Sequence, residues 1–436
     1  MTVTLEPDAS GWVRTLTHAT VSDDQKAARS ELGLPTDRPV VMSGHQAGLW
    51  HAGILAKHLA TNAAARTADA HAAWLVVDQD TEPPMKLAWP ERDGERLVRR
   101  ERDLEPGAHP DTPAAMRPTV NVADTPPAFG DIAHALNIDA RSSGEQAARA
   151  NATLIRDRLG TPEPTMVLAT CLPRLEVFQD WLGRIADDAE ACVAAYNQAV
   201  RAHPDAGIRP LIARPGVDRF ELPLWRVRSG KPRRGVMADE VRTIPPEELA
   251  PRALLMTAIV RTVACDLFIH GTGGAAYDGV TEQWIGEWLG RSLAPTAVAT
   301  ATVRLDPARF GGVTPANEAE IARARWRAHT ARHRPALVGD IQTEKRRDEL
   351  VRAIDAAPWK SAERLELYKE LHRLIEVHRG AHEDAISTLD TEADRLAATR
   401  ADAAVASDRT WPWPLHAGED LLMLRSKIDS AFGVLR

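Results

Sequence analysis

The stretch that decides the fold is residues 39–80, PVVMSGHQAGLWHAGILAKHLATNAAARTADAHAAWLVVDQD. A short apolar run at residues 40–42 precedes residues 49–59, where apolar or small residues recur at helical spacing. A second apolar run, residues 72–77, then ends in the polar tripeptide DQD at residues 78–80. Strand, helix and strand in this order predict a right-handed βαβ unit with parallel strands.

Polar residues follow both strands of this unit. The tetrapeptide SGHQ at residues 43–46 follows the first strand, and DQD at residues 78–80 follows the second. Because ligands of parallel α/β sheets bind beyond the carboxyl ends of the strands, we expect the two clusters to meet in one crevice.

The helix of this unit begins near His51, and three chemistries are open to its histidines. In a nucleotide site, an imidazole at a helix start can donate to a phosphate, the helix adds its own N–H groups, and Gly53 lets the ligand approach the backbone. In a metal site, His45, His51 and His58 join the aspartates as ligands of a first-row ion, although their spacing matches no H-E-x-x-H pattern. In the third alternative the histidines, His58 especially, only cap and pack the helix.

Composition limits the class of protein. The chain has 436 residues, enough for two or three domains, and 54 Lys+Arg against 61 Asp+Glu give a formal net charge of -7. A general nucleic-acid binder is therefore not expected, although a local basic pocket stays open. The 3 scattered cysteines favour neither a disulfide scaffold nor a zinc site. No secretion signal or bilayer-length apolar run is found, so we expect a cytoplasmic protein with no membrane segment.

A second glycine turn follows a later apolar run. Residues 266–270 (DLFIH) end in GTGG at residues 271–274, and a helix is predicted over residues 281–289. The N–H groups of this turn can cradle a phosphate or a carboxylate as a second wall of the same crevice. The alternative is a tight turn between strand and helix, with Asp278 near the helix start.

The remaining elements are predicted from apolar spacing and from proline and glycine breaks. Residues 166–170 and 295–305 are predicted as core strands, residues 175–202 as one long helix, and residues 95–98 and 119–122 as short strands. The predicted division of the chain is residues 1–82, the first part of the core; 83–142, an inserted, β-rich connecting region; 143–305, the rest of the core with a hairpin insertion at about 207–245; 306–405, a helical coiled-coil arm; and 406–436, an aromatic tail that docks on the core.

The predicted arm carries apolar or near-apolar residues at steps of three and four between residues 365 and 400. This spacing indicates a helical hairpin or a coiled-coil seam. His378 falls in the seam, where we expect it to set the register of the helices and not to bind a metal.

Three motifs, in the same order, resemble those of the bacillithiol biosynthesis cysteine-adding enzymes, also called bacillithiol synthases. Residues 43–50 (SGHQAGLW) resemble the family's T-G-Q-Q-A-G-L-F, and residues 74–80 (WLVVDQD) are similar to its W-x-x-x-E-D-H-D. Residues 271–274, followed by a helix that contains tyrosine, resemble G-G-P-G-E-x-x-Y. The chain departs from the family at His45, at residues 78–80 and at Ala275, and HAGI keeps three of the four H-x-G-H positions.

The resemblance implies an α/β fold with a Rossmann-like parallel sheet core related to the H-x-G-H nucleotidyltransferases, connecting insertions, and a C-terminal α-helical coiled-coil arm that pairs subunits in a homodimer. The activity it implies is a ligase reaction that adds cysteine to glucosaminyl malate. A divergent member is expected to join cysteine or a similar amino acid to an amino sugar or another amine.

The sequence hypothesis is therefore a ligase whose crevice binds ATP or ADP and a small-molecule substrate, without nucleic acid or membrane. Asp78 and Asp80 are expected to bind the substrate amine or Mg²⁺, and no other metal site is predicted. The alternatives are a non-catalytic nucleotide-binding or coiled-coil scaffold and a metal-dependent hydrolase. The predicted catalytic residues are His45, His51, Asp78 and Asp80; the substrate-binding residues are Gln46, Trp50, Tyr277 and Asp278; and the nucleotide-binding residues are Gly44, Gly48, Gly53, Gly271, Gly273 and Gly274.

Overall fold

The computed structural model describes residues 1–105, 109–214, 216, 219–275, 277–310 and 315–434. The chain divides into two compact units. The first, called the core unit below, comprises residues 1–89, 100–305 and 409–436; the second, the helical unit, comprises residues 90–99 and 306–408.

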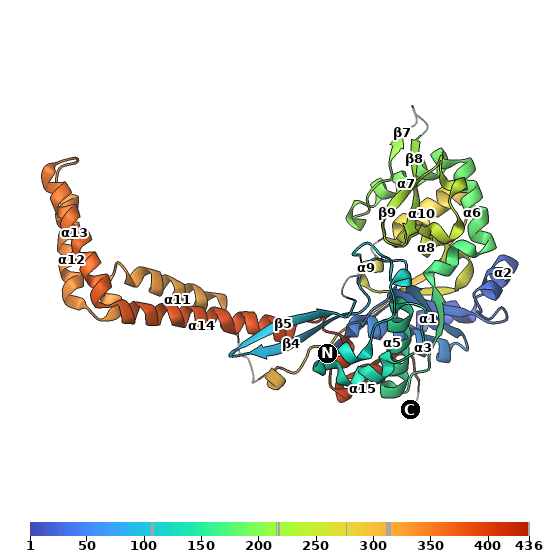
Figure 1. Ribbon diagram of the computed structural model, residues 1–436, viewed down its shortest axis with the longest axis horizontal. Helices are drawn as coiled ribbons and strands as arrows, with labels where there is room; N and C mark the ends of the chain where they lie inside the picture. Colours follow the sequence, from blue (N-terminus) through green and yellow to red (C-terminus); the bar gives the residue numbers. More distant parts are fainter. Residues whose placement is uncertain (106–108, 215, 217–218, 276, 311–314, 435–436) are drawn as a thin grey trace. The chain divides into compact units, whose positions relative to one another are not determined.

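A six-stranded sheet forms the centre of the core unit (Figure 1). Its strands are β1 (Thr2–Glu6), β2 (Val40–Gln46), β3 (His71–Val77), β6 (Thr165–Leu168), β11 (Leu267–His270) and β12 (Thr296–Thr302). They lie in the order β1-β12-β11-β2-β3-β6, and every neighbouring pair is parallel except β1 with β12. Numbered along the chain, the parallel strands are therefore arranged 3-2-1-4-5 from β6 to β12, the order of doubly wound folds. The predicted α/β class with a parallel sheet is confirmed.

Successive side chains of β2 enter two different hydrophobic cores, because neighbouring residues of a strand point to opposite faces. Val41 packs with Trp74 and Ile269 on one face, whereas Val40 and Met42 pack on the other. A strand covered on both faces needs a continuous apolar run, which is the pattern that predicted it.

Helices cover both faces of this sheet (Figure 1). One core receives side chains from α1 (Ala9–Thr17), α3 (Ala52–Thr67), α4 (Ala133–Leu136), α5 (Ser143–Leu159) and α15 (Gly418–Ala431). The opposite core receives side chains from α2 (Asp23–Glu31), α6 (Glu176–Asp187), α7 (Ala189–Ala202), α8 (Ala253–Ile259) and α10 (Asp278–Leu289).

The single long helix predicted over residues 175–202 is wrong, because α6 and α7 are separate. Asp188, between them, has φ -139° and ψ 61°, outside the helical range. Its side chain accepts a hydrogen bond from Ala191 N at 3.2 Å and so caps the start of α7.

Two smaller sheets complete the strands. The first contains β7 (Ala213–Arg214), β8 (Arg219–Arg228), β9 (Lys231–Met237) and β10 (Leu249–Pro251), with β8 and β9 forming a hairpin. The second is a hairpin of β4 (Lys86–Asp93) and β5 (Arg96–Asp103), whose outer half belongs to the helical unit.

The predicted strand at residues 119–122 is absent from the structure, which has a 3-10 turn at Val122–Asp124. The side chain of Gln146 replaces a neighbouring strand: its Oε1 accepts from Val120 N at 2.9 Å, and its Nε2 donates to Val120 O at 3.2 Å. The peptide groups of Val120 are satisfied without a strand partner, whereas the strand predicted at residues 95–98 is present as part of β5.

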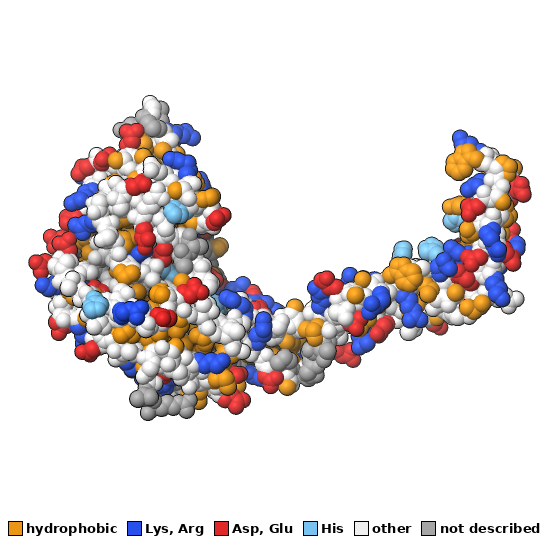
Figure 2. Space-filling model, turned by 180° about the vertical axis from the view of Figure 1, so that it is seen from behind, with side chains coloured by type: hydrophobic (Ala, Val, Ile, Leu, Met, Phe, Trp, Pro, Cys, Tyr) orange, Lys and Arg blue, Asp and Glu red, His pale blue; other side chains and the backbone are white. Residues whose placement is uncertain are grey.

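The helical unit contains two pairs of packed helices. Its helices are α11 (Glu318–Ala331), α12 (Ile341–Ala356), α13 (Ala362–Ala381) and α14 (Glu383–Ser407). α11 packs on α14 and α12 packs on α13. The stretch predicted as one seam is divided at His382, and within this unit the α12–α13 pair turns away from the α11–α14 pair (Figure 1). Acidic and basic side chains are mixed over the surface of these helices (Figure 2). Among the residues described, no helix is long and apolar enough to cross a bilayer.

The described part of the C-terminal segment, residues 409–434, returns to the core unit, and residues 412–413 pack beside the start of α3. Trp411 and Trp413 are both 0% exposed. The indole of Trp413 donates to Asn151 Oδ1 at 2.9 Å, and its backbone N–H donates to Trp50 O at 2.7 Å. Pro412 forms a β-bridge with His51, so this segment helps to fix the residue at the start of α3.

Candidate active site

A cleft of about 520 Å³ opens at the carboxyl ends of β2 and β11. These strands are neighbours at the point where the strand order reverses, which is where doubly wound sheets bind their ligands. The segments that follow β2, β3 and β11 all line it. The predicted site residues that the structure brings together here are Gly44, His45, Gln46, His51, Gly53, Asp80, Gly271, Gly273, Gly274 and Tyr277.

His51 is the N-cap residue of α3. Its Nδ1 accepts a hydrogen bond from Gly53 N at 3.0 Å, so the proton of the neutral ring is on Nε2. A Cβ at Gly53 would lie 2.7 Å from His51 Cε1 and 3.1 Å from Ala301 O, so glycine is required for the ring to close over the helix start. The N–H groups and the partial positive charge of α3 lie at the wall of the cleft.

Lys57 is a buried cation of the same helix. Its side chain lines the cleft but the residue is only 4% exposed. Its Nζ donates to Gly44 O at 2.6 Å and lies 5.7 Å from the centre of the Trp74 ring. Burial lowers the pKa of Lys57 to about 7. Near neutral pH this residue can therefore bind an anion as an ammonium or accept a proton as an amine.

His45 is uncharged at neutral pH. Burial, and then the positive charge of Lys57, lower the pKa of His45 to about 3. Its Nδ1 lies 3.3 Å from Gln46 O, and because a carbonyl only accepts, the proton is on Nδ1. His45 is suited to hydrogen bonding with a substrate and not to neutralising a phosphate.

Arginines from the second sheet and from the residue before α8 form another wall. The guanidinium groups of Arg233 and Arg252 lie 5.0 Å and 3.9 Å from the centre of the Trp225 ring. Arg233 also pairs with Asp80 at 3.3 Å, and Arg252 pairs with Glu221 at 2.6 Å. Stacking and pairing hold both side chains in place, which reduces the entropy lost when an anion binds.

Positive charge predominates among the described residues of the cleft. Lys57, Arg233, Arg252 and Arg409 line it, against the single carboxylate of Asp80. In a chain with a net charge of -7, this local excess indicates an anionic ligand.

The glycine turn after β11 uses one of its own N–H groups internally. The N–H of Gly274 donates to Gly271 O at 3.0 Å, so it is not available to a ligand. A Cβ at Gly274 would lie 2.5 Å from His270 Nδ1, so glycine lets the imidazole pack against the turn. Gly273 lines the cleft. Ala276, in the same stretch, lies outside the described residues.

Two predicted acidic site residues lie outside the cleft. Asp78 is 2% exposed and accepts hydrogen bonds from Thr170 N at 3.0 Å and Thr170 Oγ1 at 2.6 Å. Asp278 is buried, and its Oδ1 lies 3.3 Å from Arg261 Nη1 and 3.1 Å from His270 Nε2. The Asp78 carboxylate is held by Thr170 and that of Asp278 by Arg261, and neither residue lines the cleft.

Trp50 and Gly48 are also absent from the cleft lining. Trp50 is buried, with its ring centre 4.7 Å from that of Trp74 and 6.2 Å from that of His58. Gly48 O accepts a hydrogen bond from Asn151 Nδ2 at 2.5 Å. These residues join the helix to the core, as apolar spacing alone would suggest for Trp50.

The sequence did not single out the cations of the site. Lys57 and the Lys231–Arg234 turn carry charges that are usually solvated, and only the fold shows that Lys57 and Arg233 face a cleft. Arg409 lies in the predicted tail, residues 406–436, whose expected docking on the core was the one signal for its position. Among the described residues, the three side chains that converge as possible metal ligands, Asp340, His378 and His382, do not line the cleft.

Comparisons with known proteins add no functional evidence. No family model matches the chain, and no curated protein matches it. Among solved structures, a tyrosyl-tRNA synthetase from Archaeoglobus fulgidus, in complex with L-tyrosine, matches at 12% identity and a TM-score of 0.30, over 98% of this chain and 100% of that chain. A likeness at this TM-score carries no argument, and the α/β assignment rests on the strand order of the central sheet.

Proposed function

We propose that the cleft binds ATP or ADP together with an amino acid, and that the protein is a ligase that joins a carboxylate to an amine. The supporting observation is the cationic lining at the β2–β11 switch point, where the start of α3 meets Lys57 and Arg233. Helix starts and buried cations are the groups that stabilise phosphate charge in proteins.

In the proposed reaction, a carboxylate oxygen of the amino acid attacks a phosphorus atom of ATP and displaces ADP or pyrophosphate. The amine nitrogen of the acceptor then attacks the acyl carbon, and phosphate or AMP leaves with the bonding electrons. The proton lost by the amine passes to a base. Neutral Lys57 is suited to this step because burial lowers its pKa to about 7.

The substrates follow from the resemblance of residues 43–50 and 74–80 to bacillithiol synthases. Cysteine or a similar amino acid supplies the carboxylate, and an amino sugar or another amine is the acceptor. Asp80 is the carboxylate available to the substrate amine or to Mg²⁺, since Asp78 is held by Thr170.

Nucleotide binding can be tested with two neighbouring arginines of β9. Arg233 lines the cleft, whereas Arg234 is exposed and pairs with Glu240 at 2.5 Å. Since a hydrogen bond to a charged group contributes about 1.5–3 kcal/mol, Arg233→Gln should weaken ADP binding by roughly 10–100-fold. The matched variant Arg234→Gln should bind ADP as the wild type does. Isothermal titration calorimetry measures both affinities, and equal weakening by the two substitutions would contradict this location.

A non-catalytic scaffold is the second candidate. Only one of the two predicted aspartates, Asp80, lines the cleft, and the side-chain amide of Gln79 donates a hydrogen bond to Pro251 O at 2.5 Å. The two functions differ in product formation. Mass spectrometry of incubations with ATP, cysteine and glucosaminyl malate should detect the amide product if the ligase proposal holds. Nucleotide binding without product from this or other amine acceptors would favour the scaffold, and no heat with ATP or ADP would reject the nucleotide site.

A further inference from the structure

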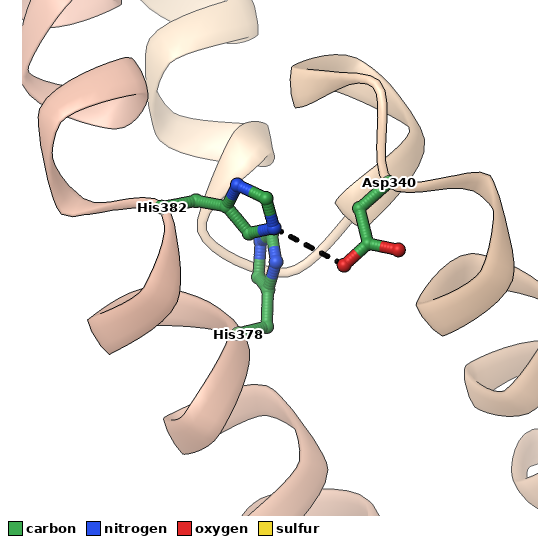
Figure 3. A group of neighbouring side chains, drawn as sticks. All are labelled: Asp340, His378 and His382. Carbon is green, nitrogen blue, oxygen red and sulfur yellow. Dashed lines mark hydrogen bonds and ion pairs between the residues drawn. The ribbon is translucent and has the colours of Figure 1, made fainter.

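Three metal-ligating side chains converge in the helical unit, far along the chain from the cleft residues. Asp340, His378 and His382 each offer one ligand atom, and these atoms lie within 4.8 Å of one another. Figure 3 shows the carboxylate of Asp340 pointing at the His382 ring, with the His378 ring beside them. His378 lies in the last turn of α13, and His382 is the residue that follows the end of that helix.

His378 has a buried ring nitrogen whose only role in this arrangement is to accept. Its Nε2 lies 2.9 Å from Ala331 O, and a carbonyl cannot donate, so Nε2 carries the proton. The lone pair is therefore on Nδ1, which has no hydrogen-bond partner among the described residues although His378 is only 2% exposed. An unsatisfied buried acceptor is costly. Metal-ligating histidines commonly donate their other ring N–H to a backbone carbonyl in this way.

Asp340 supplies the carboxylate of the group. It caps the start of α12, where its Oδ1 accepts from Thr343 N at 3.0 Å. Its Oδ2 lies 3.1 Å from His382 Nε2, so a negatively charged ligand is already positioned between the helix start and the imidazole.

We propose that Asp340, His378 and His382 bind one divalent transition-metal ion of the Zn²⁺ class. Two imidazoles and one carboxylate are a donor set that such ions prefer, and water can complete the coordination. The side chains of His382 and Asp340 are 29% and 22% exposed, so an ion can enter from solvent. On binding, the His382–Asp340 hydrogen bond is replaced by two bonds to the ion, and the His382 proton moves from Nε2 to Nδ1.

The ion would connect two junctions of the helical unit. Asp340 lies between α11 and α12, and His382 lies between α13 and α14, where the two helix pairs meet. A hydrogen bond between His382 and Asp340 alone would also link these junctions, but it leaves Nδ1 of His378 without a partner among the residues described. Metal binding accounts for all three side chains.

The test uses tag-free, full-length protein that has been stripped with a chelator. Zn²⁺ affinity is measured by competition with a chromophoric chelator, and the ligand set is examined by the visible absorption of Co²⁺. The wild type should bind one ion per chain and give Co²⁺ bands. His378→Ala and Asp340→Asn should each lower Zn²⁺ affinity by at least about tenfold, since even the loss of a hydrogen-bond partner of a metal ligand costs about 10–100-fold.

His372→Ala is the matched control, because His372 is exposed on the same helix, α13. It should retain the wild-type affinity and Co²⁺ spectrum. Far-UV circular dichroism checks that each variant is folded. If His378→Ala does not fold, the comparison of Asp340→Asn with the wild type still tests the site. Absence of stoichiometric binding by the wild type would overturn the proposal. Equal affinity in Asp340→Asn, His378→Ala and His372→Ala would overturn it as well.

Discussion

From about pH 7 to about pH 10, the free energy of unfolding of the wild-type protein should rise by several kcal/mol relative to that of Lys57→Met. Burial lowers the pKa of Lys57 to about 7 in the folded protein, whereas a lysine in the unfolded chain has a pKa of about 10.4. In this interval the unfolded state binds the proton and the folded state does not. Each pH unit therefore adds about 1.4 kcal/mol to stability. Below the folded-state pKa, Lys57 is protonated in both the folded and the unfolded state, and the full cost of burying the ammonium is present. The difference in free energy of unfolding between wild type and Lys57→Met therefore does not change with pH in that range.

Methionine is a suitable replacement because it is unbranched, apolar and similar in length. Urea unfolding followed by tryptophan fluorescence across this pH range gives the two stability curves. Lys26→Met is the control, since the Lys26 side chain is 51% exposed and should not alter the pH dependence. Parallel curves for wild type and Lys57→Met would show that folding does not lower the pKa of Lys57.

The same substitution should reduce nucleotide affinity. Lys57 lines the cleft, and a charge-assisted hydrogen bond contributes about 1.5–3 kcal/mol, so ADP should bind Lys57→Met roughly 10–100-fold more weakly at neutral pH. A residue that lowers stability in the free protein yet strengthens ligand binding is expected at a functional site. Lys57→Met binding ADP as tightly as wild type would remove Lys57 from the proposed site.

The second large effect separates two aspartates that the sequence treats alike. Asp78→Ala should lower the free energy of unfolding by about 3 kcal/mol, because Thr170 loses two hydrogen bonds to a buried charged group. Asp80→Ala should lower it by less than about 1 kcal/mol, because the Asp80–Arg233 pair is partly exposed. The effect on turnover should be the reverse: Asp80→Ala should lose activity although it remains folded, whereas Asp78→Ala should lose activity only as far as it unfolds.

Chemical denaturation and product formation are measured on the same preparations. The comparison is internally controlled, because each aspartate serves as the reference for the other. A stable but inactive Asp78→Ala protein would show that Asp78 acts in catalysis, as the sequence predicts. An active Asp80→Ala protein would leave the cleft without a carboxylate for the amine or for Mg²⁺.

The central sheet could be predicted because its strands are buried on both faces. Continuous apolar runs, such as residues 40–42 and 72–77, have few alternatives once a helical segment separates them. Elements that depend on distant side chains could not be predicted in this way. Residues 119–122 alternate like a strand, but Gln146 satisfies the peptide groups of Val120 and no partner strand is needed.

The candidate site was predictable in its position and less so in its chemistry. Strand ends identified His51 and Asp80, because the polar clusters follow apolar runs. The same argument included Asp78, which the structure places outside the cleft lining, with its carboxylate accepting two hydrogen bonds from Thr170. The cations Arg252 and Arg409 come from segments whose approach to the cleft depends on tertiary packing, which no local pattern records.

The return of residues 409–436 to the core unit has a consequence for synthesis. α15 covers part of α3, yet the ribosome makes it only after the helical unit. At about 5–20 residues per second, the roughly 100 residues of that unit take about 5–20 s to translate. During that delay the nascent chain exposes the part of α3 that α15 later covers, and apolar surface of this kind is what chaperones bind.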